Sequence, residues 1–219
     1  MYSPQRFRLF NQTLWLSPDR CIFWEEENAL ILSDLHFGKT GHFRKEGIGV
    51  PQKIYKEDLH RLFNQVQFFK PSVLLITGDM FHSYNNKEID FFLKWRRDLP
   101  NITFYLIKGN HDVLPDKFYQ EANITVAKNM LSIGNFCFTH DFCFNSEKKK
   151  ENYFTFSGHI HPGIRMKGPG KQSCMLPCFY FAETYAVLPA FSLFSGLYKL
   201  TPKKRDTVFA LVEGQVIRL

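Results

Sequence analysis

The 219-residue chain contains 44% hydrophobic and 22% charged residues and carries a formal net charge of +7. This balance is typical of a globular protein and excludes a disordered chain. No run of about 18 or more apolar residues is present, which excludes a transmembrane helix. The excess of basic residues favours a polyanionic partner such as nucleic acid, although charge alone does not identify one.

Cysteine usage indicates a reducing compartment. The five cysteines form an odd set without a CxxC pair, which suits neither a disulfide framework nor a zinc knuckle. The N-terminal segment lacks the uninterrupted apolar stretch of a secretory signal. We therefore expect a cytoplasmic protein without a membrane anchor. No stretch has the composition of a linker, so we expect a single domain over residues 1–219.

In the first half of the chain, short apolar runs alternate with segments whose apolar residues recur at helical spacing. Two short strands are predicted within residues 13–24, and core strands over 29–33, 73–77 and 102–108. Apolar residues at helical spacing predict helices over 52–69 and 87–99. This alternation indicates a parallel sheet, in which a ligand site is expected at the carboxyl ends of the strands.

The second half contains few helical periods and is predicted to be rich in strands. We expect these strands over residues 131–140, 153–157, 178–185, 191–200 and 208–219, the last with a hairpin turn at Glu213 and Gly214. Residues 142–152 contain a lysine run and predict a polar surface insertion. Two stacked sheets are the simplest arrangement for such a chain.

Five predicted strands end in acidic, amide or imidazole residues. Asp34 and His36 follow the first core strand, and residues two apart on an extended chain point to the same side. Six of the eight histidines lie in such strand-end motifs. The whole set is Asp34, His36, Asp79, His82, Asn110, His111, His140, His159 and His161. A lone histidine after a strand is usually structural, whereas five motifs of one chemical type indicate a common metal site.

The number and type of these side chains indicate two divalent ions. A single catalytic zinc takes only about three protein ligands. Two ions about 3.5–4 Å apart, bridged by a carboxylate, activate water and hold the oxygens of a displacement at phosphorus. The absence of thiolates favours manganese, iron or zinc. Hydrolysis of a phosphate ester is therefore expected, and no GxSxG, Walker or GxGxxG motif competes.

The order of these motifs resembles the calcineurin-like metallophosphoesterase superfamily. The resemblance implies an α/β fold, a four-layer α/β/β/α sandwich of two mixed sheets. It implies one metal held by Asp34, His36, Asp79 and His161, and another held by Asp79, Asn110, His140 and His159. His111 would act on the phosphoryl group as an acid or a stabilising donor. His82, in GDMFH, resembles a histidine that orients the phosphodiester in double-strand-break repair nucleases, with a plain surface histidine as the alternative.

A closer resemblance covers nearly the whole chain. The segments SDLHFGKTGHFRKEGIGVP, GHIHP, LPCF and LPAFSLFSG are similar to the small bacterial ligase-associated DNA damage response endonucleases. His111, by contrast, stands where the lipid A pathway's UDP-diacylglucosamine hydrolases carry arginine. The closer resemblance implies a dinuclear phosphodiesterase that cleaves DNA as a repair endonuclease, with manganese expected first and iron or zinc as alternatives.

The same resemblance implies partners and substrate contacts. DNA would be the substrate, and a DNA ligase, a helicase and a second nuclease would be associated proteins. The candidate substrate contacts are Lys39, His42, Arg44 and Lys45, with solvated turn charge as the alternative. Two other functions remain open: a phosphoesterase acting on nucleotides, cyclic nucleotides or other small phosphate esters, and a non-catalytic scaffold.

Overall fold

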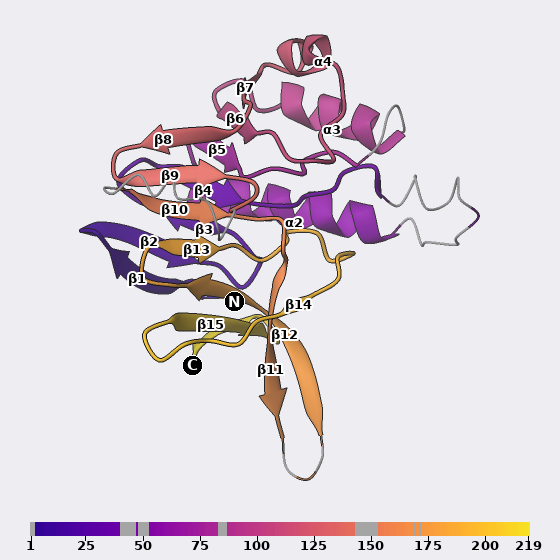
Figure 1. Ribbon diagram of the computed structural model, residues 1–219. Coiled ribbons are helices and arrows are strands. Elements are labelled where there is room, and N and C mark those ends of the chain that lie inside the picture. The colour runs from indigo at the N-terminus through magenta and orange to yellow at the C-terminus, as the bar shows by residue number, and fades with distance from the viewer. Residues whose placement is uncertain are drawn as a thin grey trace.

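The computed structural model describes residues 3–39, 47, 53–82, 87–142, 153–168, 170 and 172–219. Its strands form two mixed sheets, one of seven strands and one of nine. The described helices lie with the seven-stranded sheet, and the hairpin of β11 (Pro162–Lys167) and β12 (Ser173–Phe181) projects from the body of the molecule (Figure 1). This agrees with the predicted pair of mixed sheets in an α/β protein.

The seven-stranded sheet is antiparallel at its beginning and parallel at its end. The antiparallel strands are β1 (Gln5–Leu9), β2 (Gln12–Leu16), β3 (Ile22–Trp24) and β4 (Ala29–Leu32). The strands that continue the sheet in parallel with β4 are β5 (Val73–Ile76), β6 (Thr103–Ile107) and β7 (Ile124–Ala127). The helices between them are α2 (Lys53–Phe69), α3 (Lys87–Arg97) and α4 (Asp116–Glu121). The parallel part therefore has the strand–helix alternation expected from the sequence.

The nine-stranded sheet contains the second half of the chain. Its strands are β8 (Met130–Ile133), β9 (Phe136–Thr139), β10 (Phe154–Ser157), β11 (Pro162–Lys167), β12 (Ser173–Phe181), β13 (Tyr185–Val187), β14 (Tyr198–Lys199), β15 (Thr207–Val212) and β16 (Gln215–Arg218). Strands β9, β10 and β13 are parallel neighbours, whereas most other pairs are antiparallel. Ends of β9 and β10 that carry predicted ligands therefore lie next to each other.

Two apolar cores fix the positions of these strand ends. The core between the sheets is rich in aromatic rings, among them Trp24, Phe138, Phe156 and Phe181. On the other face of the seven-stranded sheet, Leu62 of α2 and other helix side chains cover the parallel strands. Full burial of such a side chain stabilises the fold by about 1.5–3 kcal/mol. The site is thus built at the ends of strands that are packed on both faces.

The main core strands and both long helices are confirmed, with ends that differ by one or two residues. The predicted strand over 191–200 is wrong, since only β14 is a strand there. Arginine side chains bind the backbone carbonyls of this segment: Arg20 donates to Ser192 O (2.8 Å) and Arg61 to Phe191 O (3.0 Å). The single strand predicted over 131–140 is instead a pair of antiparallel strands joined by a turn at Gly134.

Some structure was not predicted, and some predictions lie outside the described residues. The unpredicted elements are β1, α4, β7, β11 and β13. The strand predicted over 178–185 ends at Phe181 in β12, and β13 begins only at Tyr185. Within the described ranges, no helix covers the outer face of the nine-stranded sheet, where the resemblance implied an outer helical layer. The polar insertion falls mostly on residues 143–152, outside those ranges. In the parts of the chain that are described, none of the helices has the length and apolar character to cross a membrane.

Candidate metal centre

The predicted ligands gather where strands of both sheets end. Asp34 follows β4, Asp79 follows β5 and Asn110 follows β6, which are neighbouring parallel strands. His140 follows β9, and His159 and His161 follow its parallel neighbour β10. Carboxyl ends of parallel strands share one edge of a sheet. Each sheet therefore contributes its own group of ligands to the same place.

These residues leave their strands in an unusual backbone conformation. The φ angles are 55° at Asp34, 49° at His36, 49° at Asp79, 68° at His159 and 49° at His161. A positive φ is uncommon for residues other than glycine and costs free energy. The two residues of the Asp34 motif therefore do not converge through an extended chain, as the sequence pattern suggested. Left-handed turns after the strands direct the side chains inward.

Asp34, His36 and His161 form a buried triad, here named the Asp34 triad. Asp34 Oδ1 lies 4.0 Å from His36 Nε2 and 3.3 Å from His161 Nε2. None of these three atoms has a hydrogen-bond partner within the described structure, an arrangement that is costly for buried polar groups. Burial lowers the pKa of His36 to about 3, so its imidazole is neutral. A divalent cation fits this set, because it satisfies all three atoms at once.

Asp79, His140 and His159 form a second triad, the Asp79 triad. His140 Nε2 lies 3.3 Å from Asp79 Oδ2, 3.1 Å from His159 Nδ1 and 3.0 Å from Asn110 Oδ1. His140 Nδ1 donates to Thr77 O (3.0 Å), so Nε2 becomes the lone-pair donor of this ring once a cation displaces its proton. Second-shell carbonyls orient metal-ligating histidines in this way. Four electron-donating atoms thus surround one position that suits a cation.

The charges of the Asp79 triad also favour a bound cation. Burial opposes protonation of His140, but the hydrogen bond and charge of Asp79, with the charge of Asp34, raise the pKa of His140 to about 9. Burial also opposes ionisation of Asp79, but His140 and the His111 N–H lower the pKa of Asp79 to about 2. The local field is therefore strongly negative and attracts positive charge.

Hydrogen bonds from the protein hold one oxygen of each carboxylate. Asp34 Oδ2 accepts from Ser33 Oγ (2.5 Å) and from His159 N (3.1 Å). Asp79 Oδ1 accepts from His111 N (2.9 Å). The other oxygen of each group, Oδ1 of Asp34 and Oδ2 of Asp79, faces its triad. The carboxylates are thus oriented before any ligand binds.

Three glycines are required by close contacts with the triads, and one of them is Gly109, where a Cβ would lie 2.2 Å from Asp79 Oδ1. A Cβ at Gly78, whose φ is +86°, would lie 2.1 Å from His140 Nδ1. A Cβ at Gly158 would lie 1.7 Å from Ser33 Oγ and 2.6 Å from Asp34 Oδ2. Backbone approaches this close are open to glycine alone. The glycines of the GD and GHIH motifs therefore shape the ligand geometry directly.

Replacing Gly158 by alanine is expected to weaken manganese binding about 10- to 100-fold, because the new methyl group displaces Ser33 and Asp34. Gly196→Ala is the matched control, since a Cβ there meets no atom within 4 Å. Isothermal titration calorimetry with Mn²⁺ measures both variants. Wild-type affinity in Gly158→Ala would show that this close approach does not set the position of Asp34.

His82 and His111 lie together beside the Asp34 triad. Their ring centroids are 4.3 Å apart, and each ring lies against His36, at 5.3 Å and 5.5 Å respectively. The two histidines predicted to act on the phosphoryl group are therefore brought to the same side of the centre. They come from the loops after β5 and β6.

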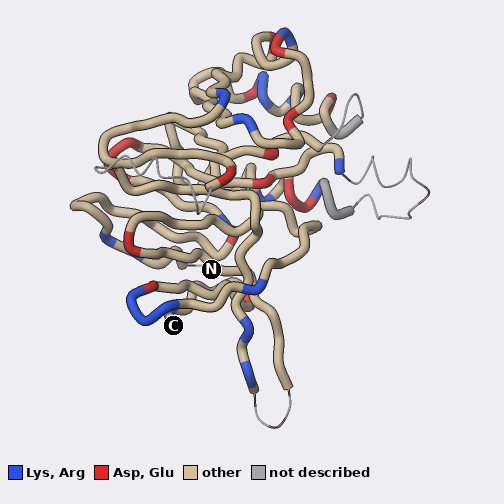
Figure 2. The backbone as a smooth tube through the Cα atoms, viewed as in Figure 1, with Lys and Arg blue, Asp and Glu red and all other residues tan. Residues whose placement is uncertain are grey.

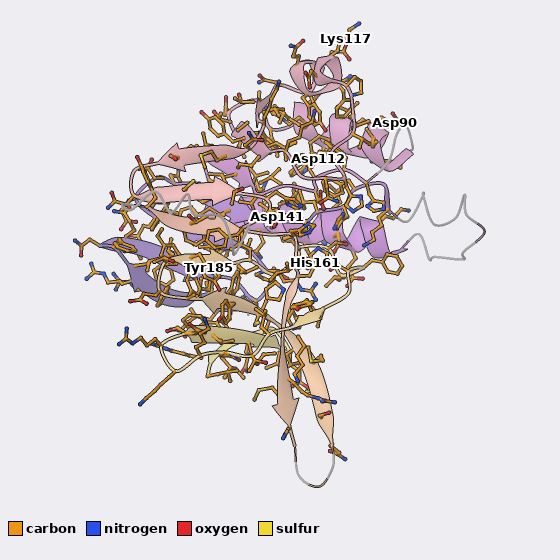
Figure 3. All side chains as sticks on the ribbon, in the orientation of Figure 1. Asp90, Asp112, Lys117, Asp141, His161 and Tyr185 are labelled. Atoms are coloured by element: carbon orange, nitrogen blue, oxygen red, sulfur yellow. The ribbon has the colours of Figure 1, made fainter. Side chains whose placement is uncertain are left out.

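Asp112 directly follows Asn110 and His111 in the chain, but the sequence alone assigns it no role. The structure places it 3% exposed behind the site (labelled in Figure 3). Its Oδ1 accepts from Phe81 N and its Oδ2 from Gly109 N, both at 2.9 Å. One carboxylate thereby ties the His82 loop to the His111 loop. In the sequence, the position of this acid directly after His111 is the feature that could have indicated such a role.

Asp112→Asn is expected to destabilise the protein by about 1–3 kcal/mol, because an amide has one acceptor for two buried N–H groups. Both loop histidines should lose their relative position, so turnover should fall as well. Urea unfolding and kcat report these effects. Asp90→Asn, an exposed position on α3, is the control. Equal stability of the two variants would contradict a loop-tying role.

The predicted substrate contacts are only partly described. Lys39 lies close to the centre: burial lowers its pKa, whereas the charges of Asp34 and Asp79 oppose this. Its Nζ is 5.8 Å from the centre of the Phe194 ring. The other three candidates, His42, Arg44 and Lys45, lie outside the described residues.

Comparisons with known proteins find similarity in sequence and in overall structure. The sequence model of the family described as calcineurin-like phosphoesterase matches residues 28–169. The crystal structure of Pseudomonas putida nuclease MPE is similar with a TM-score of 0.83 and 25% identity, covering 99% of this chain and 100% of that chain.

More distant similarity extends to two other solved structures. Yfce, a phosphoesterase from E. coli, has a TM-score of 0.45 and 12% identity over 84% of this chain and 88% of its own. An uncharacterised protein from Streptococcus pneumoniae has a TM-score of 0.36 and 11% identity over 87% of this chain and 95% of its own. No curated protein sequence matches the chain.

Proposed function

Because the chain belongs to the calcineurin-like phosphoesterases, we propose that it is a dinuclear metal-dependent phosphodiesterase that cleaves DNA as a repair endonuclease. The observation that carries the proposal is the convergence of two triads of oxygen and nitrogen ligands, each with a buried carboxylate and one buried histidine. Similarity over the full length to a protein named as a nuclease supports nucleic acid as the substrate. The association with a ligase, a helicase and a second nuclease rests on the resemblance in sequence alone.

In this proposal the Asp34 triad and Asp79 hold one ion. The Asp79 triad and Asn110 hold the other, with Asp79 shared between them. The donors are carboxylate, amide and imidazole groups, so we expect manganese first, with iron or zinc as alternatives. When bound, two such ions supply an activated water and positive charge opposite the phosphoryl oxygens.

The remaining side chains act on the substrate. His111 and His82 donate hydrogen bonds to the phosphoryl oxygens and stabilise the charge that develops there. Lys39 contributes a positive charge at the edge of the centre, where it attracts the DNA backbone. No described element has the form of a known base-reading module, so we expect little sequence preference.

Substrate competition tests the proposal. The Mn²⁺-loaded protein is incubated separately with single-stranded DNA, duplex DNA, bis(p-nitrophenyl) phosphate, nucleoside monophosphates and cyclic nucleotides. Internal cleavage of DNA, abolished by EDTA and restored by Mn²⁺, is the expected result. Exclusive action on mononucleotides or cyclic nucleotides would replace the DNA assignment. Absence of hydrolysis with any divalent ion would favour a scaffold.

A further inference from the structure

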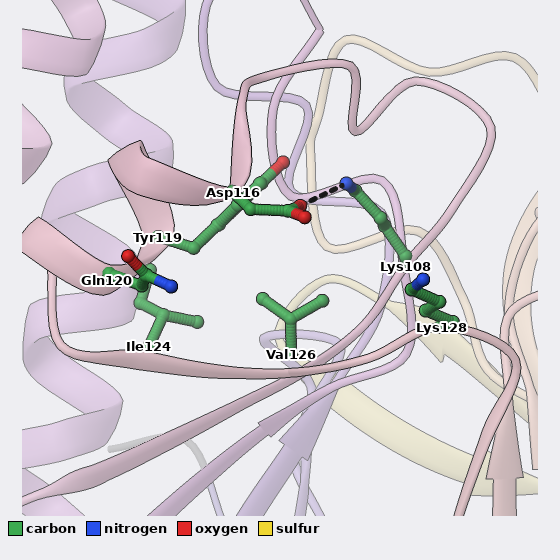
Figure 4. A pocket seen from close by; sticks show the side chains of 7 residues that line it. All are labelled: Lys108, Asp116, Tyr119, Gln120, Ile124, Val126 and Lys128. Carbon is green, nitrogen blue, oxygen red and sulfur yellow. Dashed lines mark hydrogen bonds and ion pairs between the residues drawn. The ribbon is translucent and has the colours of Figure 1, made fainter.

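A second cavity opens next to the candidate metal centre. It has a volume of about 570 Å³, within the usual range of about 300–1,000 Å³ for ligand sites. We name it the lysine pocket; it is lined by Lys108, Asp116, Tyr119, Gln120, Ile124, Val126 and Lys128 (Figure 4). None of these residues belongs to either triad.

The lysine pocket lies close to the metal centre because β6 ends between them. Lys108 is followed by Gly109 and then by Asn110, whose Oδ1 contacts His140. Two residues of extended chain span at most about 7 Å. A polymer bound at the metal centre can therefore reach this pocket, whereas a small diester held by the ions cannot fill both.

Two cations project from neighbouring strand ends into the pocket. Ile107 of β6 pairs with Ala127 of β7, and Lys108 N donates to Ala127 O (2.8 Å). The lysines that follow these paired residues, Lys108 and Lys128, consequently leave the sheet side by side. Within the described part of the chain, Lys128 has no ion-pair partner. Paired lysines at a concave surface suit a phosphate group.

Asp116 already forms an ion pair with Lys108 and would compete with a phosphate for this lysine. Lys108 Nζ lies 3.2 Å from Asp116 Oδ1, and the Asp116 side chain is 76% exposed. An exposed ion pair of this kind contributes little and is screened by salt. Asp116 can therefore turn toward solvent when a stronger anion approaches Lys108.

The rest of the lining suits the organic part of a nucleotide. Val126 is partly exposed at the floor of the pocket. Ile124 and Tyr119 are 5% and 1% exposed and support this floor from the core, with the centre of the Tyr119 ring 5.2 Å from Lys108 Nζ. The exposed amide of Gln120 offers both a donor and an acceptor. An apolar surface and an amide beside positive charge suit one nucleotide of a nucleic-acid strand.

We propose that the lysine pocket is a nucleotide-binding subsite that holds one unit of the substrate strand beside the scissile phosphate. A backbone phosphate binds between Lys108 and Lys128, and the adjoining sugar and base lie against Val126 and Gln120. This inference rests on the proposed action on nucleic acid and extends it to a second contact point. A second contact of this kind would favour a polymer over a small ester.

Binding of a fluorescent single-stranded DNA oligonucleotide, measured by anisotropy in EDTA, tests the subsite independently of cleavage. The double variant Lys108→Gln with Lys128→Gln is expected to bind about tenfold more weakly, since two charge contacts are lost. The slope of log affinity against log salt should fall by about 0.7 for each lost phosphate contact. Lys204→Gln is the control, because the basic turn 203–205 lies at the other end of the molecule from α4 (Figure 2).

Two further variants give effects that a structural role alone would not produce. Asp116→Asn removes the competing acid and is expected to strengthen oligonucleotide binding about threefold. Val126→Phe keeps both lysines but fills the apolar floor, and it should raise KM for DNA. Neither variant should change turnover of bis(p-nitrophenyl) phosphate by more than about twofold, since this small diester does not enter the pocket.

The outcomes separate the subsite from the proposed function. If the wild-type protein cleaves DNA but all three variants bind and cleave it as the control does, the subsite is wrong and the function stands. If the wild-type protein binds the oligonucleotide through these lysines but never cleaves it, the subsite stands and the proposed activity is wrong. Equal loss of affinity in Lys204→Gln would reduce the effect to overall charge and overturn the subsite.

Discussion

Replacing Asp79 by asparagine is expected to lower kcat/KM for phosphodiester hydrolysis by about 10³-fold or more, because each ion supplies several kcal/mol of transition-state stabilisation. Asp79 Oδ2 faces the Asp79 triad, and its Oδ1 accepts from His111 N. Asparagine keeps an acceptor for that N–H but loses the negative charge and one ligand oxygen. The fold should persist while the ions are lost. Metal analysis of the purified variant, paired with kinetics, measures both effects.

Asp141→Asn is the matched control for this variant. Asp141 follows His140 directly, but its side chain is exposed, and it is labelled in Figure 3. It should keep wild-type metal content and activity. If Asp79→Asn kept both as well, the dinuclear mechanism would be wrong, whatever the identity of the metal.

The parallel strands could be predicted because burial on both faces leaves a distinctive pattern. The runs that became β4, β5 and β6 are continuous and apolar, and each ends abruptly in polar residues. Placement of those polar residues at one edge then follows from the parallel arrangement. The gathering of the predicted ligands into two triads could therefore be expected from the order of motifs.

The local geometry of the centre could not be predicted in the same way. Asp34 and His36 reach one point through left-handed turns, and no residue-type pattern announces a positive φ at aspartate or histidine. Similarly, the contacts of Asp112 with Phe81 N and Gly109 N join loops about 30 residues apart. Such positions are set by packing of the whole sheet, which periodicity does not describe.

The lysine pocket shows a second limit of sequence reasoning. Its walls come from α4 and β7, which are six and four residues long. Elements this short contain about one or two helical turns or pleats, too few to establish a period. Lys108 and Lys128 are twenty positions apart in the chain, and only the β6–β7 register brings them together. In the sequence the basic run 203–205 is more conspicuous than these two lysines, although it lies far from α4 (Figure 2).

His111→Asn is expected to lower kcat about 10²- to 10³-fold without changing metal content, because a donor to the developing phosphoryl charge is lost. The backbone N–H that Asp79 accepts from is kept, so the carboxylate should remain oriented. His82→Asn should give a loss of similar kind. The two rings are 4.3 Å apart, so both side chains are expected to act on the same phosphoryl group.

That proximity makes the double variant the decisive measurement. Residues that act as a unit show strongly non-additive losses, so the double variant should be only slightly slower than His111→Asn. Fully additive losses would mean that the two histidines act at separate steps or on separate groups. Asn substitution at His60, on the exposed face of α2, is the matched control and should leave kcat unchanged. A loss of bound metal in His111→Asn would instead place this histidine among the ligands, and the division between metal-holding and phosphoryl-facing side chains would have to be redrawn.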